Sequence, residues 1–298
     1  MKKFYYGGQA VVEGVMMRGR KTMVTAVRRP DGSLAAETQP LPPLYSGWLR
    51  QTPLIRGIIV LIESMTLGIK ALMYSTNVSL EEEGEKVSGG MAGIMMAFSL
   101  ALAVGLFSIL PLFLTRLFQF ESSIVFNLVE GVIRVTIFLV YLRVMSLVPD
   151  IKRVFAYHGA EHKTVNAYEA GASLDIDSVK KYSTAHTRCG TSFLFIVMIV
   201  SIIVFSLTGL HGIWLMVLSR IVLIPLIASL SYEFIYFGAR HSHNPVIKAL
   251  LTPGLWLQSF TTREPDDAQI EVGILAMQKV IETEKEEENL PAEPLPAA

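Results

Sequence analysis

The sequence has few charged residues and almost no cysteine, and both shortages narrow the classes of protein to consider. Charged residues make up 17% of its 298 residues, against about 25% in an ordinary soluble domain. Cys189 is the single cysteine, which excludes an intramolecular disulfide and a four-cysteine zinc site. The 26 basic and 26 acidic residues give a formal net charge of zero, so no specific nucleic-acid binding is expected.

Hydrophobic residues, in contrast, make up 51% of the chain and are gathered into long runs. The mean hydropathy is +0.45. Four runs reach the roughly 20 residues needed to cross a bilayer, namely residues 91–114, 127–148, 193–210 and 213–237. We therefore expect a mainly α-helical polytopic membrane protein with about four transmembrane helices. These form a first pair over 91–148 and a second hairpin over 193–237.

A further apolar segment, residues 54–75, is interrupted by three charged residues at seven-residue spacing, Arg56, Glu63 and Lys70. Seven residues are close to two helical turns, so the three side chains share one face. This pattern predicts an amphipathic helix that is interfacial or re-entrant.

The distribution of basic residues predicts the topology. No apolar segment of signal-peptide type follows Met1, Lys2 and Lys3. Residues 1–53 hold eight Lys and Arg and residues 149–192 hold six, whereas residues 115–126 hold one. Basic loops stay on the cytoplasmic side, so both termini and the 149–192 loop are expected there. The lipid bilayer is the expected partner, together with a membrane protein as partner or substrate.

The remaining segments are expected to be polar. In residues 1–53 we expect a Gly-rich loop over 7–19 and a β-hairpin over 21–41, with its turn at Pro30-Asp31-Gly32. The Gly-rich loop lacks the Gly-Lys-Ser/Thr ending of a phosphate loop. It either packs structurally or presents Glu13 and Arg18 to a partner. Residues 238–262 are expected to be cytoplasmic, and the acidic, Pro-rich tail 263–298 is expected to be disordered.

A His-x-x-Glu-His pattern in the 149–192 segment carries the clearest chemistry. On a helix, His158 and His162 lie one turn apart on one face, so both imidazoles can reach one ion. Glu161 can then act as base on a water activated by that ion, as in inverted zinc peptidases. The alternative is a polar helix whose His and Glu side chains only bond to their neighbours.

The sequence leaves the third ligand open. Glu169 shares the face of the two histidines, but seven residues place it about 10 Å along the axis. His186 and Cys189 are better candidates, since both are borderline-soft ligands spaced for a turn. Glu233 follows at a separation that suits a distal ligand. Alternatively, Cys189 is a buried apolar residue and Glu233 pairs with Arg240.

Other polar residues lie in or near the apolar runs. His241 and His243 follow the last run and are either ligands or interfacial polar residues. Glu130 lies within a predicted span, where a carboxylate suggests function. A pair with Arg134, four residues later, is the simpler interpretation.

Three motifs together resemble the YqhQ family of bacterial membrane proteins, for which metal-dependent enzyme activity has been suggested. They are Gly7–Gly19, His158–Lys163 with Tyr168 and Glu169, and Arg188–Phe193. The likeness covers about residues 4–262 and implies a bacterial cytoplasmic membrane location. It draws attention to eight residues: Glu13, His158, Glu161, His162, Glu169, His186, Arg188 and Cys189.

Two functional hypotheses follow. In the first, the chain is a hydrolase at the cytoplasmic membrane face that uses a divalent ion, Zn²⁺ by ligand type. In the second, it is a membrane scaffold, assembly or translocation accessory protein with a structural metal or none. A transporter ranks third, because no internal repeat is visible. Three converging ligands beside a cleft would favour the enzyme, and four would favour a structural site.

Overall fold

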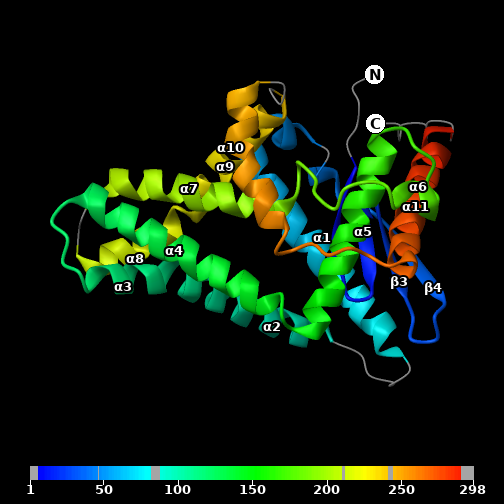
Figure 1. Ribbon diagram of the computed structural model, residues 1–298, viewed down its shortest axis with the longest axis horizontal. Helices are drawn as coiled ribbons and strands as arrows, with labels where there is room; N and C mark the ends of the chain where they lie inside the picture. The colour runs from blue at the N-terminus through cyan, green and yellow to red at the C-terminus, as the bar shows by residue number, and fades with distance from the viewer. Residues whose placement is uncertain (1–5, 46, 82–87, 210–211, 241–243, 290–298) are drawn as a thin grey trace, which may run out of the picture.

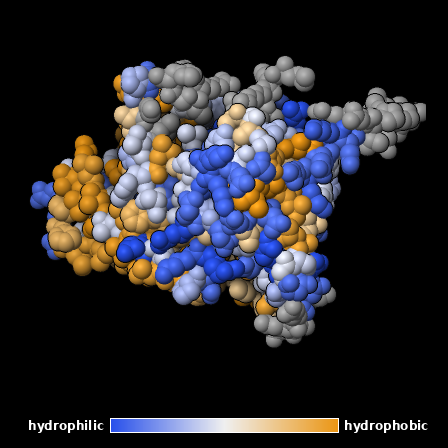
Figure 2. Space-filling model, turned by 45° about the vertical axis from the view of Figure 1, so that its right-hand side comes forward, coloured by the Kyte–Doolittle hydropathy of each residue, from blue (hydrophilic) through white to orange (hydrophobic). Residues whose placement is uncertain are grey.

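The molecule has an apolar end of long helices and a polar end built around a small sheet (Figure 1). Figure 2 shows hydrophobic residues gathered over the first end and hydrophilic residues over the second. This computed structural model describes residues 6–45, 47–81, 88–209, 212–240 and 244–289.

Long apolar helices form the first end. A 28-residue helix, Gly89–Arg116, comprises α2 (Gly89–Val104), the π-helical segment η4 (Gly105–Ile109) and α3 (Leu110–Arg116). The others are α4 (Ser123–Met145), α7 (Gly190–Thr208), α8 (Ile213–Val222) and α9 (Ile224–Arg240), with a bend of 46° between α8 and α9. Together with α1, four described helices are long and apolar enough to cross a membrane, or five if the bent pair is one span. The prediction of a helical polytopic membrane protein is confirmed.

Helix α1 (Ile55–Ser79) links the two ends of the molecule. By length and composition it would suffice to cross a membrane. Its N-terminal part packs on α9, where Gly57 allows close approach to Ser229. Further along, Leu67 and Ala71 are buried in one cluster with residues of the sheet. The helix runs four residues beyond the predicted end at 75.

The polar end contains a four-stranded antiparallel sheet in the order β1-β2-β3-β4. The strands are β1 (Gly7–Val11), β2 (Gly14–Arg18), β3 (Thr22–Arg28) and β4 (Leu34–Pro40). Strands β3 and β4 are the predicted hairpin. Strands β1 and β2 correct the expectation of a Gly-rich loop over 7–19. Glycine is rare in strands, so the many glycines of this segment favoured a loop. The apolar residues 15–17, which are typical of a strand, were outweighed.

Both faces of the sheet are buried, as the alternation of side chains along its strands shows. Val15, Met17 and Val24 contribute to one cluster with residues of α5 (Pro149–Glu169) and α11 (Asp267–Asn289). Met16 and Met23 face the other way and pack with α1. The sheet is therefore the middle layer between α1 and the α5–α11 pair.

Helix α11 corrects, for residues 267–289, the expectation that the segment 263–298 is a disordered tail, and residues 290–298 lie outside the described residues. The helix buries Ile270, Val272, Met277 and Val280, and so completes the core on one face of the sheet.

Two other helices lie in the segments expected to be polar. They are the short α6 (Ile176–Val179) and α10 (Pro245–Gln258). Helix α10 packs against α7, with Gly254 next to Ser192 and Leu257 buried near Met198. Two 3₁₀ turns, Pro43–Tyr45 and Trp48–Gln51, connect the sheet to α1.

Candidate functional site

Three potential metal ligands converge where α5 meets the start of α7. His158 and His162 lie one turn apart on α5, with ring centroids 4.4 Å apart. The Sγ atom of Cys189 lies 3.4 Å from Nε2 of His158. Each of the three residues offers a ligand atom within 4.8 Å of the other two. We call this group the His-His-Cys cluster.

Backbone carbonyls orient both imidazole rings. Nδ1 of His158 lies 2.8 Å from the carbonyl oxygen of Thr261, and Nδ1 of His162 lies 2.5 Å from that of Thr184. A carbonyl oxygen can only accept, so each Nδ1 donates, and in the neutral ring this leaves the lone pair on Nε2. Metal-binding histidines are held in this way, with one ring nitrogen on a carbonyl and the other on the ion.

Cys189 lies at the N-cap of α7, where its Sγ accepts a 3.4 Å hydrogen bond from the backbone N–H of Thr191. Unsatisfied N–H groups and the helix dipole favour negative charge at such a position. A metal ligand cysteine is a thiolate, so this placement suits coordination.

Glu161 lies beside the cluster on the same helix. Its side chain is buried, and its Oε2 lies 3.5 Å from Nε2 of His162. Strand β1 passes close by at Gly8, where a Cβ atom would lie only 2.9 Å from Cγ of Glu161. Glycine at position 8 thus allows the sheet to approach the carboxylate.

The cluster and Glu161 line a cleft of about 570 Å³. Its walls come from β1, β2, α1, α5, α9 and the start of α7. Three further candidate residues, His186, Arg188 and Arg18, line the same cleft. The three ligands and the carboxylate of Glu161 therefore face a space that is large enough for a substrate.

His186 lies next to the cluster but not within it. Its ring centroid is 5.6 Å from that of His162, and its Nε2 is 3.7 Å from Oε2 of Glu169. Burial alone would raise the pKa of Glu169, but the hydrogen bond with His186 and the paired Arg188 hold that pKa below its usual value. Glu169 is therefore paired with Arg188, which lines the cleft, and is not one of the three clustered ligands.

The structure does not bring Glu233 to the cluster. Its carboxylate accepts hydrogen bonds from Nε of Arg56 at 2.8 Å and from the backbone N–H of Leu54 at 2.9 Å. The sequence suggested a pair of Glu233 with Arg240, whose side chain lies outside the described part of the chain. His241 and His243 lie outside the described residues.

The two polar candidates of the N-terminal segment have different positions. Glu13 lies in the β1–β2 turn with φ of 49° and pairs with Arg153, with Nε 2.7 Å from Oε1. Arg18 lines the cleft and pairs with Glu63 at 2.9 Å, and Glu63 also pairs with Arg50. Glu13 thus fastens the sheet to α5, whereas Arg18 belongs to the cleft.

Sequence reasoning missed the residues that hold the site in place. Thr184 and Thr261 act through backbone carbonyls, which any residue type provides, so no motif marks them. Gln258 binds the backbone of His186 on both sides, at 2.8 Å to its N–H and 2.8 Å to its carbonyl. One signal was available at Gly159, a glycine inside a helix, where a Cβ atom would collide with the carbonyl of Arg263.

Comparisons with known proteins identify similar sequences of unknown function. A family model described as "Protein of unknown function (DUF1385)" matches residues 52–283. The "Uncharacterized protein YqhQ" of Bacillus subtilis (strain 168) is 36% identical over 297 residues, covering 94% of this chain and 93% of that protein. No solved structure matches the chain.

Proposed function

The chain belongs to the YqhQ (DUF1385) family, and from that premise we propose that it is a metal-dependent hydrolase at the cytoplasmic face of the membrane. The observation that carries the proposal is the His-His-Cys cluster beside Glu161 in an open cleft. Nε2 of His158 lies 3.4 Å from Sγ of Cys189, and a ring nitrogen of His162 lies within 4.8 Å of the ligand atoms of both.

The ligand set favours Zn²⁺. Imidazole nitrogen and thiolate sulfur are the ligands zinc prefers, and two histidines with one cysteine occur in catalytic zinc sites. Three protein ligands leave a position open, as catalysis requires. When bound, the ion would act as a Lewis acid that polarises a substrate oxygen and lowers the pKa of water.

The chain's own residues have separate roles in this proposal. Thr261 and Thr184 hold the two rings so that Nε2 points away from the backbone. Glu161 accepts the proton of the attacking water, because its carboxylate lies beside the cluster on the cleft wall. Gly8 keeps β1 close and limits the room around that carboxylate.

The charged side chains in and beside the cleft balance, because Glu169, outside the lining, pairs with Arg188. Three arginines line the cleft, Arg18, Arg50 and Arg188, against two carboxylates, Glu63 and Glu161. Burial and the charge of Arg18 lower the pKa of Arg50 to about 10, so Arg50 remains protonated at neutral pH. The candidate substrates are a lipid head group or a segment of a membrane protein.

A scaffold with a structural metal is the competing proposal, and it would need a fourth ligand. His186, a ligand candidate from the sequence, lies toward Glu169, with its Nε2 3.7 Å from Oε2 of Glu169. The geometry therefore favours the enzyme, and metal stoichiometry with activity will separate the two.

The first experiment measures zinc by elemental mass spectrometry in detergent-purified protein. We expect about one zinc per chain, lost in His162→Ala and kept in His186→Ala. Absence of metal from the wild type, even after zinc reconstitution, would overturn the proposal.

The second experiment screens chromogenic phosphoesters, carboxylic esters and peptides for hydrolysis. Glu161→Gln should keep its zinc and lose roughly 10²- to 10⁴-fold in rate, the usual contribution of a general base. Zinc-loaded protein that hydrolyses none of these probes would support the scaffold instead. Full activity in Glu161→Gln would contradict the role of Glu161 as the base.

A further inference from the structure

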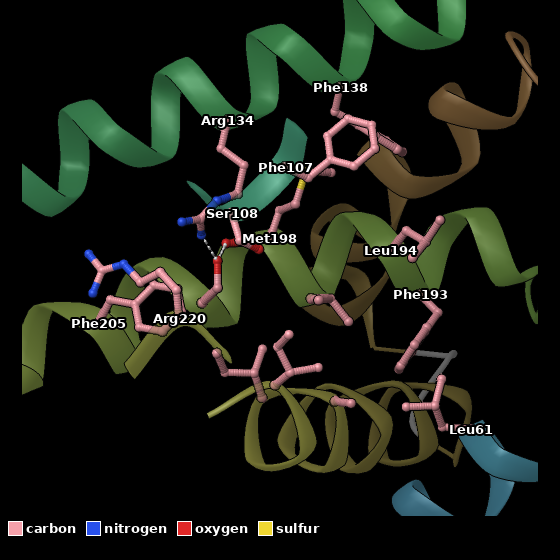
Figure 3. A pocket seen from close by; sticks show the side chains of 15 residues that line it. Leu61, Phe107, Ser108, Arg134, Phe138, Phe193, Leu194, Met198, Phe205 and Arg220 are labelled. Carbon is pink, nitrogen blue, oxygen red and sulfur yellow. Dashed lines mark hydrogen bonds between the residues drawn. The ribbon is translucent and has the colours of Figure 1, made fainter. Parts of the chain in front are cut away.

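A second cavity of about 240 Å³ lies among the apolar helices, away from the His-His-Cys cluster. Its walls are mostly aliphatic and aromatic, with Phe107, Phe138 and Met198 among them. Figure 3 shows Arg134 and Arg220 reaching toward one end of this cavity, beside Phe205. These two arginines are the only ionisable residues among its described lining residues.

The arginines share a single carboxylate. Glu130 pairs with Arg134 on the same helix, α4, and with Arg220 on α8. Arg220 also donates to Oδ1 of Asn127 at 2.8 Å, and Arg134 donates to Oγ of Ser201 at 2.5 Å. All three charged side chains are almost fully buried, with relative exposures of 1% for Glu130, 5% for Arg134 and 1% for Arg220.

This cluster carries one positive charge more than its own carboxylate neutralises. The Nε atom of Arg134 is buried and has no hydrogen-bond partner among the described residues. The ring of Phe205 lies 4.1 Å from Cζ of Arg220 and 5.2 Å from that of Arg134. Cation–π contacts stabilise such cations but do not neutralise them.

A buried, uncompensated charge is costly within a membrane and marks a functional site by default. Guanidinium groups bind carboxylate and phosphate through parallel hydrogen bonds. Apart from Ser108 and Ser201, the other residues that line the cavity are apolar. A π-helical segment, η4, supplies Phe107 and Ser108 to its wall, and such segments are frequent at functional sites.

We propose that this cavity binds the anionic group of an acyl-chain lipid, with Arg134 and Arg220 holding the anion and the apolar walls holding the chain. The carboxylate of a fatty acid and the phosphate of an anionic phospholipid share this chemistry. The proposal does not depend on the hydrolase, because none of these residues lines the cleft with the metal ligands.

Equilibrium binding of radiolabelled lipid to the full chain in an uncharged maltoside detergent tests the proposal. One arm uses palmitate and the other phosphatidylglycerol, with phosphatidylcholine as the neutral-headgroup competitor. We expect saturable binding in one arm, weakened about tenfold or more in Arg134→Gln because charged hydrogen bonds are lost. Arg143→Gln, an exposed arginine on the same helix, should bind as the wild type does.

A second variant guards against misfolding of Arg134→Gln. Val197→Phe fills the cavity and leaves both arginines in place, so it should also weaken binding. The folded state of each variant is checked by size-exclusion chromatography and circular dichroism. Equal binding by the wild type and both variants, or no binding in either arm, would overturn the proposal.

Discussion

Glu13, a single residue at the tip of the β1–β2 turn, joins the sheet to α5. The hydrogen bond from Arg153 is the main cause that holds the pKa of Glu13 below its usual value, helped by the hydroxyl of Tyr157 at 3.2 Å. Because the folded state binds the ionised form better, this contact adds stability above the unfolded pKa of 4.5. That contribution is lost as pH falls through the lower folded value.

We predict that Glu13→Gln lowers unfolding stability by about 1 kcal/mol at pH 7, a small effect because the pair is partly solvent-screened. The difference from the wild type should shrink as pH falls below about 4.5. Thermal unfolding in detergent across pH measures it, with the exposed Glu121→Gln as control. A difference that grows toward acid pH would contradict the assignment.

At the scale of single residues, the sequence indicated which side chains could bind a metal better than it indicated which side chains they contact. The spacing of His158, Glu161 and His162 placed these residues on one helix, because helical geometry is local. Cys189 approaches the two histidines because of how the start of α7 packs on α5. The spacing of residues in the sequence does not determine this packing. Glu233 lies away from the His-His-Cys cluster because its carboxylate accepts hydrogen bonds from Arg56 and from the backbone N–H of Leu54.

Helix α11 is the element that departs most from the sequence-based expectation. Its acidic residues suggested disorder, yet Ile270, Ile274, Met277 and Ile281 recur at helical spacing and pack toward the core. An acidic composition predicts disorder only where no apolar face finds a partner. Here that partner is formed by the sheet and α5, which lie far away in the sequence.

We predict that Met277→Ala destabilises the polar end by about 2–5 kcal/mol, the usual loss for a buried methionine. Lys279→Ala, exposed on the same helix, should change stability by less than about 0.5 kcal/mol. Unfolding monitored by circular dichroism and limited proteolysis compares the two. Equal stability of both variants would show that α11 is not part of the folded core.

The whole molecule separates an apolar end from a polar end (Figures 1 and 2), and this division predicts its orientation. The sheet belongs to the basic segment 1–53 and α5 to the basic segment 149–192, and the two pack together with α11. The positive-inside rule places both basic segments on the cytoplasmic side, in agreement with this packing. Charge and packing therefore predict that the polar end faces the cytoplasm.

We predict that a cysteine at Glu121, exposed between α3 and α4, reacts with an impermeant maleimide on cells whose cytoplasmic membrane is intact. A cysteine at Asp177, exposed on α6, should react only after permeabilisation. Cys189 is buried and should contribute little background in either case. The opposite labelling pattern would invert the topology and move the proposed site to the outer face.

The contact of the first strands with the last helix has a consequence for biosynthesis. The face of the sheet formed by Val15, Met17 and Val24 emerges from the ribosome long before α11, which covers it. The carbonyl of Thr261 that orients His158 is also translated late. A nascent chain must therefore protect an uncovered apolar face while its membrane helices insert, and it completes the ligand geometry only near the end of translation.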